Sequence, residues 1–215
     1  MPVPFDDRGH AGRELAARLV AQAGLEGAVV LGLPRGGVPV AAQVAASLSA
    51  PLDVFVVRKL GVPGQPELAM GAIASGGVRV LNVAVVRHLR ISETAIADVA
   101  GRESTELARR ERTYRGDRPA VALADRTVVL VDDGLATGAS MRAAVEAVRA
   151  AGPGRIVVAV PVGAQETCQM LAEVADEVVC LYTPDAFGAV GAYYVDFGQV
   201  SDDEVRRALS RDELP

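Results

Sequence analysis

The sequence contains little sulfur and few imidazole side chains. It has two cysteines, Cys168 and Cys180, and two histidines, His10 and His88. Two cysteines are too few for a disulfide framework, and neither has further ligands at the spacing that zinc sites use. We therefore expect these four side chains to be packed or solvated, and we expect no structural zinc or haem site.

Cationic charge is also scarce, and almost all of it is arginine. The 22 basic residues are outnumbered by 27 acidic ones, which gives a net charge of −5, and Lys59 is the single lysine. A protein that coats nucleic acid needs a surplus of basic residues to neutralise phosphates, so this class is excluded. Small anionic ligands held by a few local contacts are compatible with the charge.

Long apolar runs are absent too. No run approaches the roughly 18 residues that cross a bilayer. Residues 1–7 carry neither a basic start nor an apolar segment of the kind that targets a chain for export. The sequence therefore predicts a cytoplasmic protein that does not bind a membrane.

Aliphatic residues, in contrast, are abundant and follow an alternating pattern. Of 215 residues, 50% are hydrophobic, which suits one domain, 1–215, with a single core. Short apolar runs separated by helical periodicity predict an α/β fold with a doubly wound, mostly parallel sheet. The expected strands are 28–33, 52–57, 127–131, 156–160 and 177–181; the expected helices are 8–23, 38–48, 139–151, 167–174 and a last helix opened by the capping box Ser201–Glu204.

Four segments depart from this alternation. Residues 58–77 are rich in glycine and lack periodicity, which predicts a flexible lid loop. Residues 78–86 are compatible with a short strand pair. Residues 87–118 form a charged helical insertion, expected to be a solvated helix with a weak apolar stripe. The stripe consists of Ile96, Val99, Ala100 and Leu107. Residues 182–200 are expected to form a small hood-like segment toward the C-terminus, here named the hood segment.

The most informative stretch follows the expected strand 127–131. Asp132 and Asp133 come directly after it, and a turn of small residues then leads into a helix. Open α/β sheets bind ligands at the carboxyl ends of their strands, so we expect both carboxylates at that edge. The amides and hydroxyls of Thr137–Ser140 have room to close around a phosphate at the helix N-terminus. Because carboxylates do not bind phosphate, the pattern predicts a sugar phosphate whose ribose, or a hydrated magnesium ion, meets the aspartates.

Other acidic or nucleotide-binding sites fit the order of the motifs less well. The pair could cap a helix, or form the magnesium site of a response-regulator receiver domain. A receiver has its acidic pair after the first strand and a lysine late in the chain, whereas Lys59 here precedes Asp132. No Walker sequence ending in Gly-Lys-Ser/Thr is present, and no Gly-x-Gly-x-x-Gly follows a strand, which argues against ordinary nucleotide or dinucleotide binding.

The stretch 128–140 resembles the signature of the phosphoribosyltransferase family, which uses phosphoribosyl pyrophosphate (PRPP). Two further segments extend the resemblance. Pro34-Arg35-Gly36-Gly37 is similar to the family's pyrophosphate loop, a short turn after the first core strand. Arg58-Lys59 is similar to the strand end that precedes the mobile loop in some branches of the family. The resemblance implies the type I phosphoribosyltransferase fold.

The resemblance also implies a role for each matching residue. In the family, the acidic pair holds the ribose hydroxyls, partly through magnesium, which makes water-bridged Mg²⁺ on Asp132 and Asp133 the expected cofactor. The implied catalytic groups are Asp132, Asp133, Arg58 and Lys59. The implied donor-binding residues are the two aspartates with Gly134, Ala136, Thr137, Gly138, Ala139 and Ser140, and the implied pyrophosphate-binding residues are Arg35, Gly36 and Gly37.

Aromatic residues are few, yet five of the eight lie within residues 182–197. The segment 183–191 resembles the base-binding C-terminal segment of hypoxanthine-guanine phosphoribosyltransferases, with Gly188 as an extra residue after Phe187. Phe187 is therefore a candidate for stacking on a base, with ordinary core packing as the alternative. Ala136 stands where the enzymes for 6-oxopurines have an aspartate, as in adenine-type enzymes, so the two comparisons favour different acceptors.

The implied reaction is transfer of the 5-phosphoribosyl group from PRPP to a nitrogen nucleophile, with a nucleobase as the expected acceptor, as in nucleotide salvage. Pyrophosphate is the second product. Two alternatives are a non-catalytic regulatory protein that senses PRPP, and a hydrolase that uses PRPP without a base. The expected partners are the donor and a small nitrogenous acceptor, with no nucleic acid and no membrane, and a homo-oligomer is compatible with the sequence.

Overall fold

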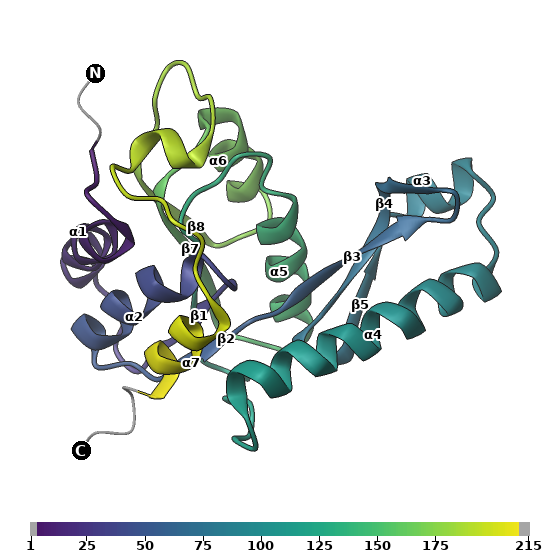
Figure 1. Ribbon diagram of the computed structural model, residues 1–215, viewed down its shortest axis with the longest axis horizontal. Helices are drawn as coiled ribbons and strands as arrows, with labels where there is room; N and C mark the ends of the chain where they lie inside the picture. Colours follow the sequence, from purple (N-terminus) through teal and green to yellow (C-terminus); the bar gives the residue numbers. More distant parts are fainter. Residues whose placement is uncertain (1–3, 211–215) are drawn as a thin grey trace.

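The computed structural model describes residues 4–210. Its centre is a five-stranded parallel sheet in the order β2-β1-β6-β7-β8 (Figure 1). The strands are β1 (Val29–Gly32), β2 (Leu52–Val54), β6 (Thr127–Val131), β7 (Arg155–Val162) and β8 (Glu177–Tyr182). All five runs predicted to be strands contribute to this sheet, and the predicted α/β fold is confirmed.

Helices cover both faces of the central sheet (Figure 1). The helices α1 (Arg8–Val20) and α2 (Gly37–Leu48) cover one face, with α7 (Asp202–Ser210) beside α2. The opposite face is covered by α5 (Ala139–Ala150) and α6 (Gln165–Ala172). The capping box predicted for the last helix is present, because the Ser201 hydroxyl lies 2.7 Å from Glu204 Oε2 and accepts from the Glu204 N–H at 3.2 Å.

Alternate residues of the central strands pack into two separate clusters. In β1, Val30 joins the cluster of α1 and α2, whereas Val29 joins the cluster of α5. In β6, Val129 and Leu130 divide in the same way. Successive side chains of a strand point to opposite faces, so a strand covered on both sides has to be apolar throughout. This explains why the strands are continuous apolar runs in the sequence.

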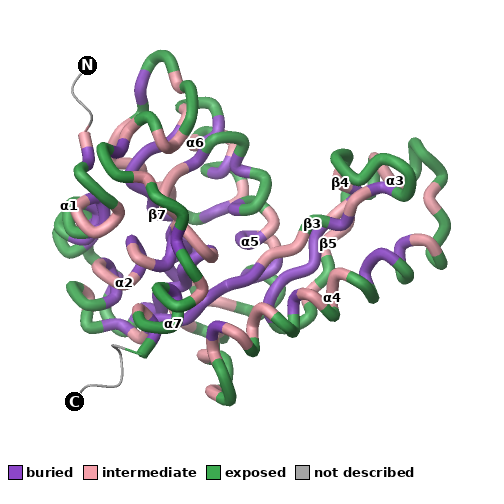
Figure 2. The backbone as a smooth tube through the Cα atoms, in the orientation of Figure 1, coloured by how far each residue is buried: buried purple, intermediate pink, exposed green. Residues whose placement is uncertain are grey.

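A smaller antiparallel sheet projects from this core (Figure 1). It consists of β3 (Val57–Val62), β4 (Gln65–Ala74) and β5 (Val78–Leu81), and the helices α3 (Val83–His88) and α4 (Glu93–Arg115) follow it. We refer to residues 57–115 as the arm. The outer end of the arm around α3 is mostly exposed, whereas the central sheet is buried (Figure 2).

The helix predicted in the charged insertion is present as α4, a single helix of 23 residues. Its predicted apolar stripe is buried, in one cluster with Leu60 of β3 and Met70 of β4. The stripe therefore packs on one face of the small sheet.

Residues 58–77 do not form the loop expected from their composition, because most of this segment is paired as β3 and β4. Two of its glycines serve close strand contact rather than flexibility. A β-carbon on Gly61 would lie 2.6 Å from the Pro66 carbonyl oxygen, and one on Gly71 would overlap the carbonyl oxygen of Val80. Glycine in a strand is often required where another backbone comes near.

Two smaller expectations also need correction. The expected strand 52–57 ends at Val54, and Val57 already belongs to the antiparallel sheet. The strand pair expected over residues 78–86 is one strand followed by α3, which Asn82 caps by accepting a hydrogen bond from the Val85 N–H at 3.2 Å. In both places β-branched residues favour a strand locally. In the second segment, the Asn82 cap starts a helix instead.

A buried ion pair joins the arm to the core. Arg115, in the last turn of α4, donates from Nε to Asp53 Oδ1 at 3.0 Å and from Nη2 to the Val54 carbonyl at 3.2 Å. The side chains of Arg115 and Asp53 are 10% and 7% exposed. The backbone N–H of Val121 completes the set by donating to Asp53 Oδ2 at 3.2 Å. The end of α4 is thereby fixed against β2.

Within residues 4–210, no helix combines the length and the apolar character needed to cross a membrane.

Candidate active site

Asp132 and Asp133 lie at the carboxyl end of β6, the edge predicted for them. Both are partly buried. Asp132 Oδ1 accepts a hydrogen bond from the backbone N–H of Asp133 at 2.9 Å. The Asp133 carbonyl oxygen accepts one from the Tyr194 hydroxyl at 2.6 Å. The backbone of the pair is therefore held from two sides, which fixes where the carboxylates stand.

Arg8 is the cation of this site, and sequence reasoning did not find it. Its Nε atom donates to Asp133 Oδ2 at 2.8 Å, and its Nη1 atom donates to the Gly198 carbonyl at 2.8 Å. Its guanidinium also lies 3.9 Å from the ring centre of Phe197. Arg8 and Asp133 are 125 positions apart in the chain, and a single arginine at the start of a helix carries no local signal of such a contact.

Burial makes the charged form of the acidic pair unfavourable. It raises the pKa of Asp132 well above the ordinary 3.8, and the charge of Asp133 raises that pKa further. Burial raises the pKa of Asp133 as well, against the opposing hydrogen bond and charge of Arg8. A ligand or metal ion that brings positive charge to this edge would lower both pKa values. The site is therefore suited to a partner that carries a cation.

The turn between β1 and α2 packs directly against the aspartates, because two of its residues lack a side chain. A β-carbon on Gly36 would overlap the Asp133 carboxylate. One on Gly37 would lie 2.7 Å from the Val131 carbonyl oxygen and 2.8 Å from Asp132 Cα. The glycines predicted to bind pyrophosphate thus bring their backbone to the acidic pair.

Arg35, the third residue of the predicted pyrophosphate set, extends in another direction. The peptide bond between Pro34 and Arg35 is cis. The Nη1 atom of Arg35 lies 3.7 Å from Asp202 Oδ1 in α7. Its side chain is 36% exposed, so the guanidinium remains accessible to solvent. The structure therefore places the turn's backbone at the aspartates and the Arg35 guanidinium beside α7.

Residues 134–140, which comprise the loop after β6 and the first two residues of α5, present their backbone at the start of a helix. Gly138 caps α5 with a positive φ of 69°, and it provides no side chain for the first amides of the helix. A β-carbon at Gly138 would lie 2.5 Å from Thr167 Cγ2, and the Thr167 hydroxyl donates to the Ala136 carbonyl at 2.6 Å. The loop is thus held against α6, and helix N-termini of this kind stabilise bound anions. The residues of this loop that are exposed are Ala136, Thr137, Ala139 and Ser140.

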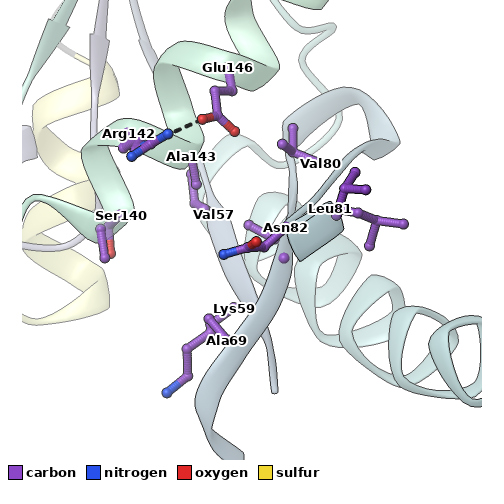
Figure 3. Close-up of a pocket in the computed structure, with 14 residues that line it drawn as sticks. Val57, Lys59, Ala69, Val80, Leu81, Asn82, Ser140, Arg142, Ala143 and Glu146 are labelled. Carbon is purple, nitrogen blue, oxygen red and sulfur yellow. Dashed lines mark hydrogen bonds and ion pairs between the residues drawn. The ribbon is translucent and has the colours of Figure 1, made fainter. Parts of the chain in front are cut away.

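Arg58 and Lys59 point to opposite faces of β3, as neighbouring residues of a strand do. Arg58 Nη2 lies 2.7 Å from Glu103 Oε2 in α4, so its guanidinium is bound within the arm. Lys59 Nζ lies 3.2 Å from the carbonyl oxygen of Glu67 and 3.3 Å from its Oε2 atom. Lys59 also lines a groove of about 480 Å³ between the small sheet and α5, which Ser140 lines from the other side (Figure 3). Of the two predicted basic residues, Lys59 is thus the one that shares a cavity with the first turn of α5.

The hood segment lies beside the acidic pair. Its Tyr194 bonds the Asp133 backbone, and its Val190 fills the space where a side chain on Gly134 would stand, with Cγ1 2.5 Å from that position. Phe187 is half-buried and stacks on Tyr193, with ring centres 5.6 Å apart and an angle of 23° between the rings. The ring of Phe187 is thus packed on one face by another aromatic residue.

Asp132 and Asp133 are also the groups that would hold a magnesium ion. Magnesium prefers oxygen ligands, keeps several waters and is commonly bound by one or two carboxylates together with substrate phosphates. Within residues 4–210, His, Cys, Asp and Glu form no group of three or more that could hold a metal by itself. Two buried carboxylates with raised pKa values fit a cation that arrives with its ligand.

This arrangement brings an acidic pair, a glycine turn and an exposed helix N-terminus to one edge of a doubly wound sheet. Comparison with known proteins gives the family of the chain. Residues 6–197 match the phosphoribosyl transferase domain family. The chain therefore belongs to the phosphoribosyltransferase family.

Individual relatives agree with this assignment. A Mycobacterium tuberculosis (H37Rv) protein named "Putative phosphoribosyl transferase Rv0571c" is 55% identical over 207 residues, which are 96% of this chain and 46% of that protein. Its counterpart in strain CDC 1551 / Oshkosh gives the same values. The chain thus spans about half the length of these curated relatives. The crystal structure of TT1426 from Thermus thermophilus is 50% identical, with a TM-score of 0.88, and the match covers 96% of this chain and 98% of that one.

Proposed function

We propose that this chain transfers the 5-phosphoribosyl group of PRPP to a nitrogen nucleophile, with a nucleobase as the acceptor, and releases pyrophosphate. The observation that carries the proposal is the meeting of three features at one edge of the sheet. These are the acidic pair, the glycine backbone of the turn after β1, and the open N-terminus of α5. Together they supply partners for a sugar, a leaving group and a terminal phosphate.

Each part of the donor has a counterpart among these groups. The 5′-phosphate would bind the amides and hydroxyls of residues 136–140, at the positive end of the α5 dipole. The ribose hydroxyls would bind Asp132 and Asp133. The pyrophosphate would bind the backbone of Gly36 and Gly37, which lies against the aspartates.

The chemistry follows from where charge develops. The bond from the anomeric carbon to pyrophosphate breaks as the bond to the acceptor nitrogen forms, and that nitrogen loses a proton. The ribose acquires positive charge in the transition state, which the two fixed carboxylates stabilise. Magnesium, when bound, would offset the negative charge of the leaving pyrophosphate.

Arg8 has a positioning role in this scheme. By donating to Asp133 at 2.8 Å and to the Gly198 carbonyl at 2.8 Å, it fixes one carboxylate relative to the hood segment. Its hydrogen bond and charge also oppose the rise that burial causes in the pKa of Asp133. The acidic pair thus meets the donor already oriented, so less free energy is lost in arranging it.

The test is release of pyrophosphate from PRPP with magnesium, in the presence of a panel of purine and pyrimidine bases. Release that depends on one base supports the transferase. Release without any base would instead indicate a hydrolase, and tight binding of PRPP without release would indicate a sensor. Absence of magnesium-dependent PRPP binding, measured by calorimetry, would overturn the sugar-phosphate assignment itself.

A further inference from the structure

The two cysteines of this chain lie together, although they belong to different elements. Cys168 is in α6 and Cys180 is in β8, the edge strand of the central sheet. A β-carbon on Gly163 would lie 2.9 Å from Cys168 Sγ and 3.4 Å from Cys180 Sγ, so both sulfurs border the same small space. Both residues are half-buried and carry free thiols.

The pKa values of the two thiols are shifted in opposite directions. Hydrogen bonding to the Cys180 side chain lowers the pKa of the Cys168 thiol. Hydrogen bonding with Cys168, together with burial, raises the pKa of the Cys180 thiol. The thiolate is the form that attacks an oxidant, so we assign the first reaction to Cys168, an assignment that the single-cysteine variants below test.

We propose that Cys168 and Cys180 form a reversible dithiol–disulfide site that reacts with peroxides. The Cys168 thiolate attacks one peroxide oxygen, which gives a sulfenic acid and, after protonation of the leaving hydroxide, a first water. The Cys180 thiol then attacks the Cys168 sulfur, which forms the S–S bond and releases a second water. One hydrogen peroxide is thereby reduced as the two thiols are oxidised, and an added dithiol restores them.

The site is connected to the loop that we assign to the 5′-phosphate. Thr167, the residue before Cys168, donates from its hydroxyl to the Ala136 carbonyl at 2.6 Å and fills the space beside Gly138. The Ala164 N–H, just before α6, donates to the Leu135 carbonyl at 3.0 Å. A disulfide holds its two β-carbons about 3.8 Å apart, so oxidation fixes α6 relative to β8. We therefore expect oxidation to alter the loop that α6 supports.

The first experiment treats the full chain with hydrogen peroxide and counts thiols, with intact mass and peptide mapping as further measurements. Because the chain has two cysteines, the thiol count reports on this pair alone. We expect loss of both thiols, a mass decrease of about 2 Da, a Cys168–Cys180 crosslink within one chain, and full recovery with dithiothreitol. Thiols that resist, crosslinks only between chains, or oxygen added to one cysteine without a crosslink would each overturn the proposal.

Single-cysteine variants test which thiol reacts first. Cys180→Ser should accumulate the Cys168 sulfenic acid, which dimedone traps. Cys168→Ser should leave a Cys180 thiol that reacts at least about tenfold more slowly with peroxide. Equal rates in the two variants would contradict the assigned order. Each variant is first checked for a native circular dichroism spectrum and unfolding transition, so that a misfolded variant is not mistaken for a slow one.

Hydrogen exchange tests the connection to the loop without reference to any catalysed reaction. Oxidation should change the exchange of amides in residues 136–140 and in α6, and it should leave the amides of α4, which lies in the arm, unchanged. Unchanged exchange in residues 136–140 after complete disulfide formation would show that the loop is independent of the thiol pair. This result does not depend on the proposed transferase, so the two proposals fail separately.

Discussion

Carboxylates in the arm and carboxylates at the edge of the central sheet meet opposite surroundings. On α4, hydrogen bonds from Arg109 and Arg110 lower the pKa of Glu106 to about 2. At the end of β6, burial raises the pKa of both Asp132 and Asp133. The α4 carboxylate is satisfied by neighbours one turn away, whereas the β6 pair shares one arginine. Carboxylates that the fold pairs only in part, such as those at the end of β6, are candidates for binding a cationic ligand or a metal ion.

The two regions also differ in the partners of their arginines and in the space around their glycines. Arg58 is bound to Glu103 within the arm, whereas Arg8 reaches a carboxylate 125 positions away in the chain. Gly36 has no room for a β-carbon, whereas Gly101 in α4 has no atom within 4 Å of that position. The core edge thus joins elements that are far apart in the chain and leaves no room for a β-carbon at Gly36, whereas the arm pairs its arginine within its own residues and leaves open space at Gly101.

The largest effect is expected at the ion pair that joins the two regions. Arg115→Met leaves Asp53 buried without its cation, and breaking a buried pair costs about 3–5 kcal/mol of unfolding free energy. Urea unfolding measures the loss. The matched control is Arg109→Met on the same helix, where the pair with Glu106 is exposed and a far smaller change is expected. Equal losses in the two variants would show that Arg115 does not anchor the arm.

The next effect concerns donor binding at the core edge. Asp132→Asn combined with Asp133→Asn removes the charge that would face magnesium and the ribose, and it should weaken magnesium-dependent PRPP binding about 100-fold, as measured by calorimetry. Glu103→Gln, a charge change of the same kind in the arm, should leave that affinity unchanged. Wild-type affinity in the double variant would remove the aspartates from the site.

Replacing Asp132 should weaken donor binding but stabilise the folded chain. A carboxyl whose pKa is raised on folding binds more protons in the folded chain, so stability falls as the pH rises from about 3.8 through the raised pKa. Asp132→Asn should therefore make the chain more stable at pH 7, with a difference that shrinks toward pH 4. Glu106 has a lowered pKa, so Glu106→Gln should lower stability at pH 7. Urea unfolding across this pH range measures both signs.

A pair of glycine substitutions tests the contrast in shape. Gly36→Ala forces a methyl group into the Asp133 carboxylate, and overpacking of this kind costs about 1–3 kcal/mol of unfolding free energy. Gly101→Ala fills open space in a helix and should stabilise the chain by roughly 0.5–1 kcal/mol. Thermal unfolding of both variants checks the two signs. An unchanged unfolding free energy in Gly36→Ala would mean that the turn does not pack tightly against Asp133.

The smallest effect separates the two basic residues of β3. If the proposed transfer occurs, Lys59→Ala should lower kcat about tenfold with little change in the Kd for PRPP, because Lys59 lies at the groove shared with Ser140. Arg58→Ala should leave kcat unchanged, because its guanidinium is bound to Glu103. A loss of turnover confined to Arg58→Ala would reverse this assignment.

The sequence predicted the central sheet well because its strands carry their own signal. Runs such as 127–131 and 156–160 are apolar throughout, which is typical of strands buried on both faces, and the structure confirms both. The apolar stripe of α4 was predicted equally well, since the helical spacing of apolar residues does not depend on what the helix packs against. The location of Asp132 and Asp133 at the sheet edge could be predicted because they come directly after such a strand.

The arm was harder to predict because its glycines, which were expected to make a loop, instead lie within paired strands. In residues 58–77 glycine indicated a loop, yet Gly61 and Gly71 lie where two backbones come too close for a side chain. That meaning exists only once the strands are paired, so composition alone cannot reveal it. Arg58 and Lys59 were likewise grouped by adjacency, and the pleat of β3 sends them to different faces.

Residues that are neighbours in the chain are enough to define the apolar runs of the strands, the acidic pair after β6 and the small-residue turns after β1 and β6. Three other features exist only once distant elements have packed together. Arg8 meets Asp133, Arg58 is bound within the arm while Lys59 lines the groove, and Cys168 lies beside Cys180. Each of these depends on which elements come into contact, and packing energy arises from contacts that local pattern does not encode.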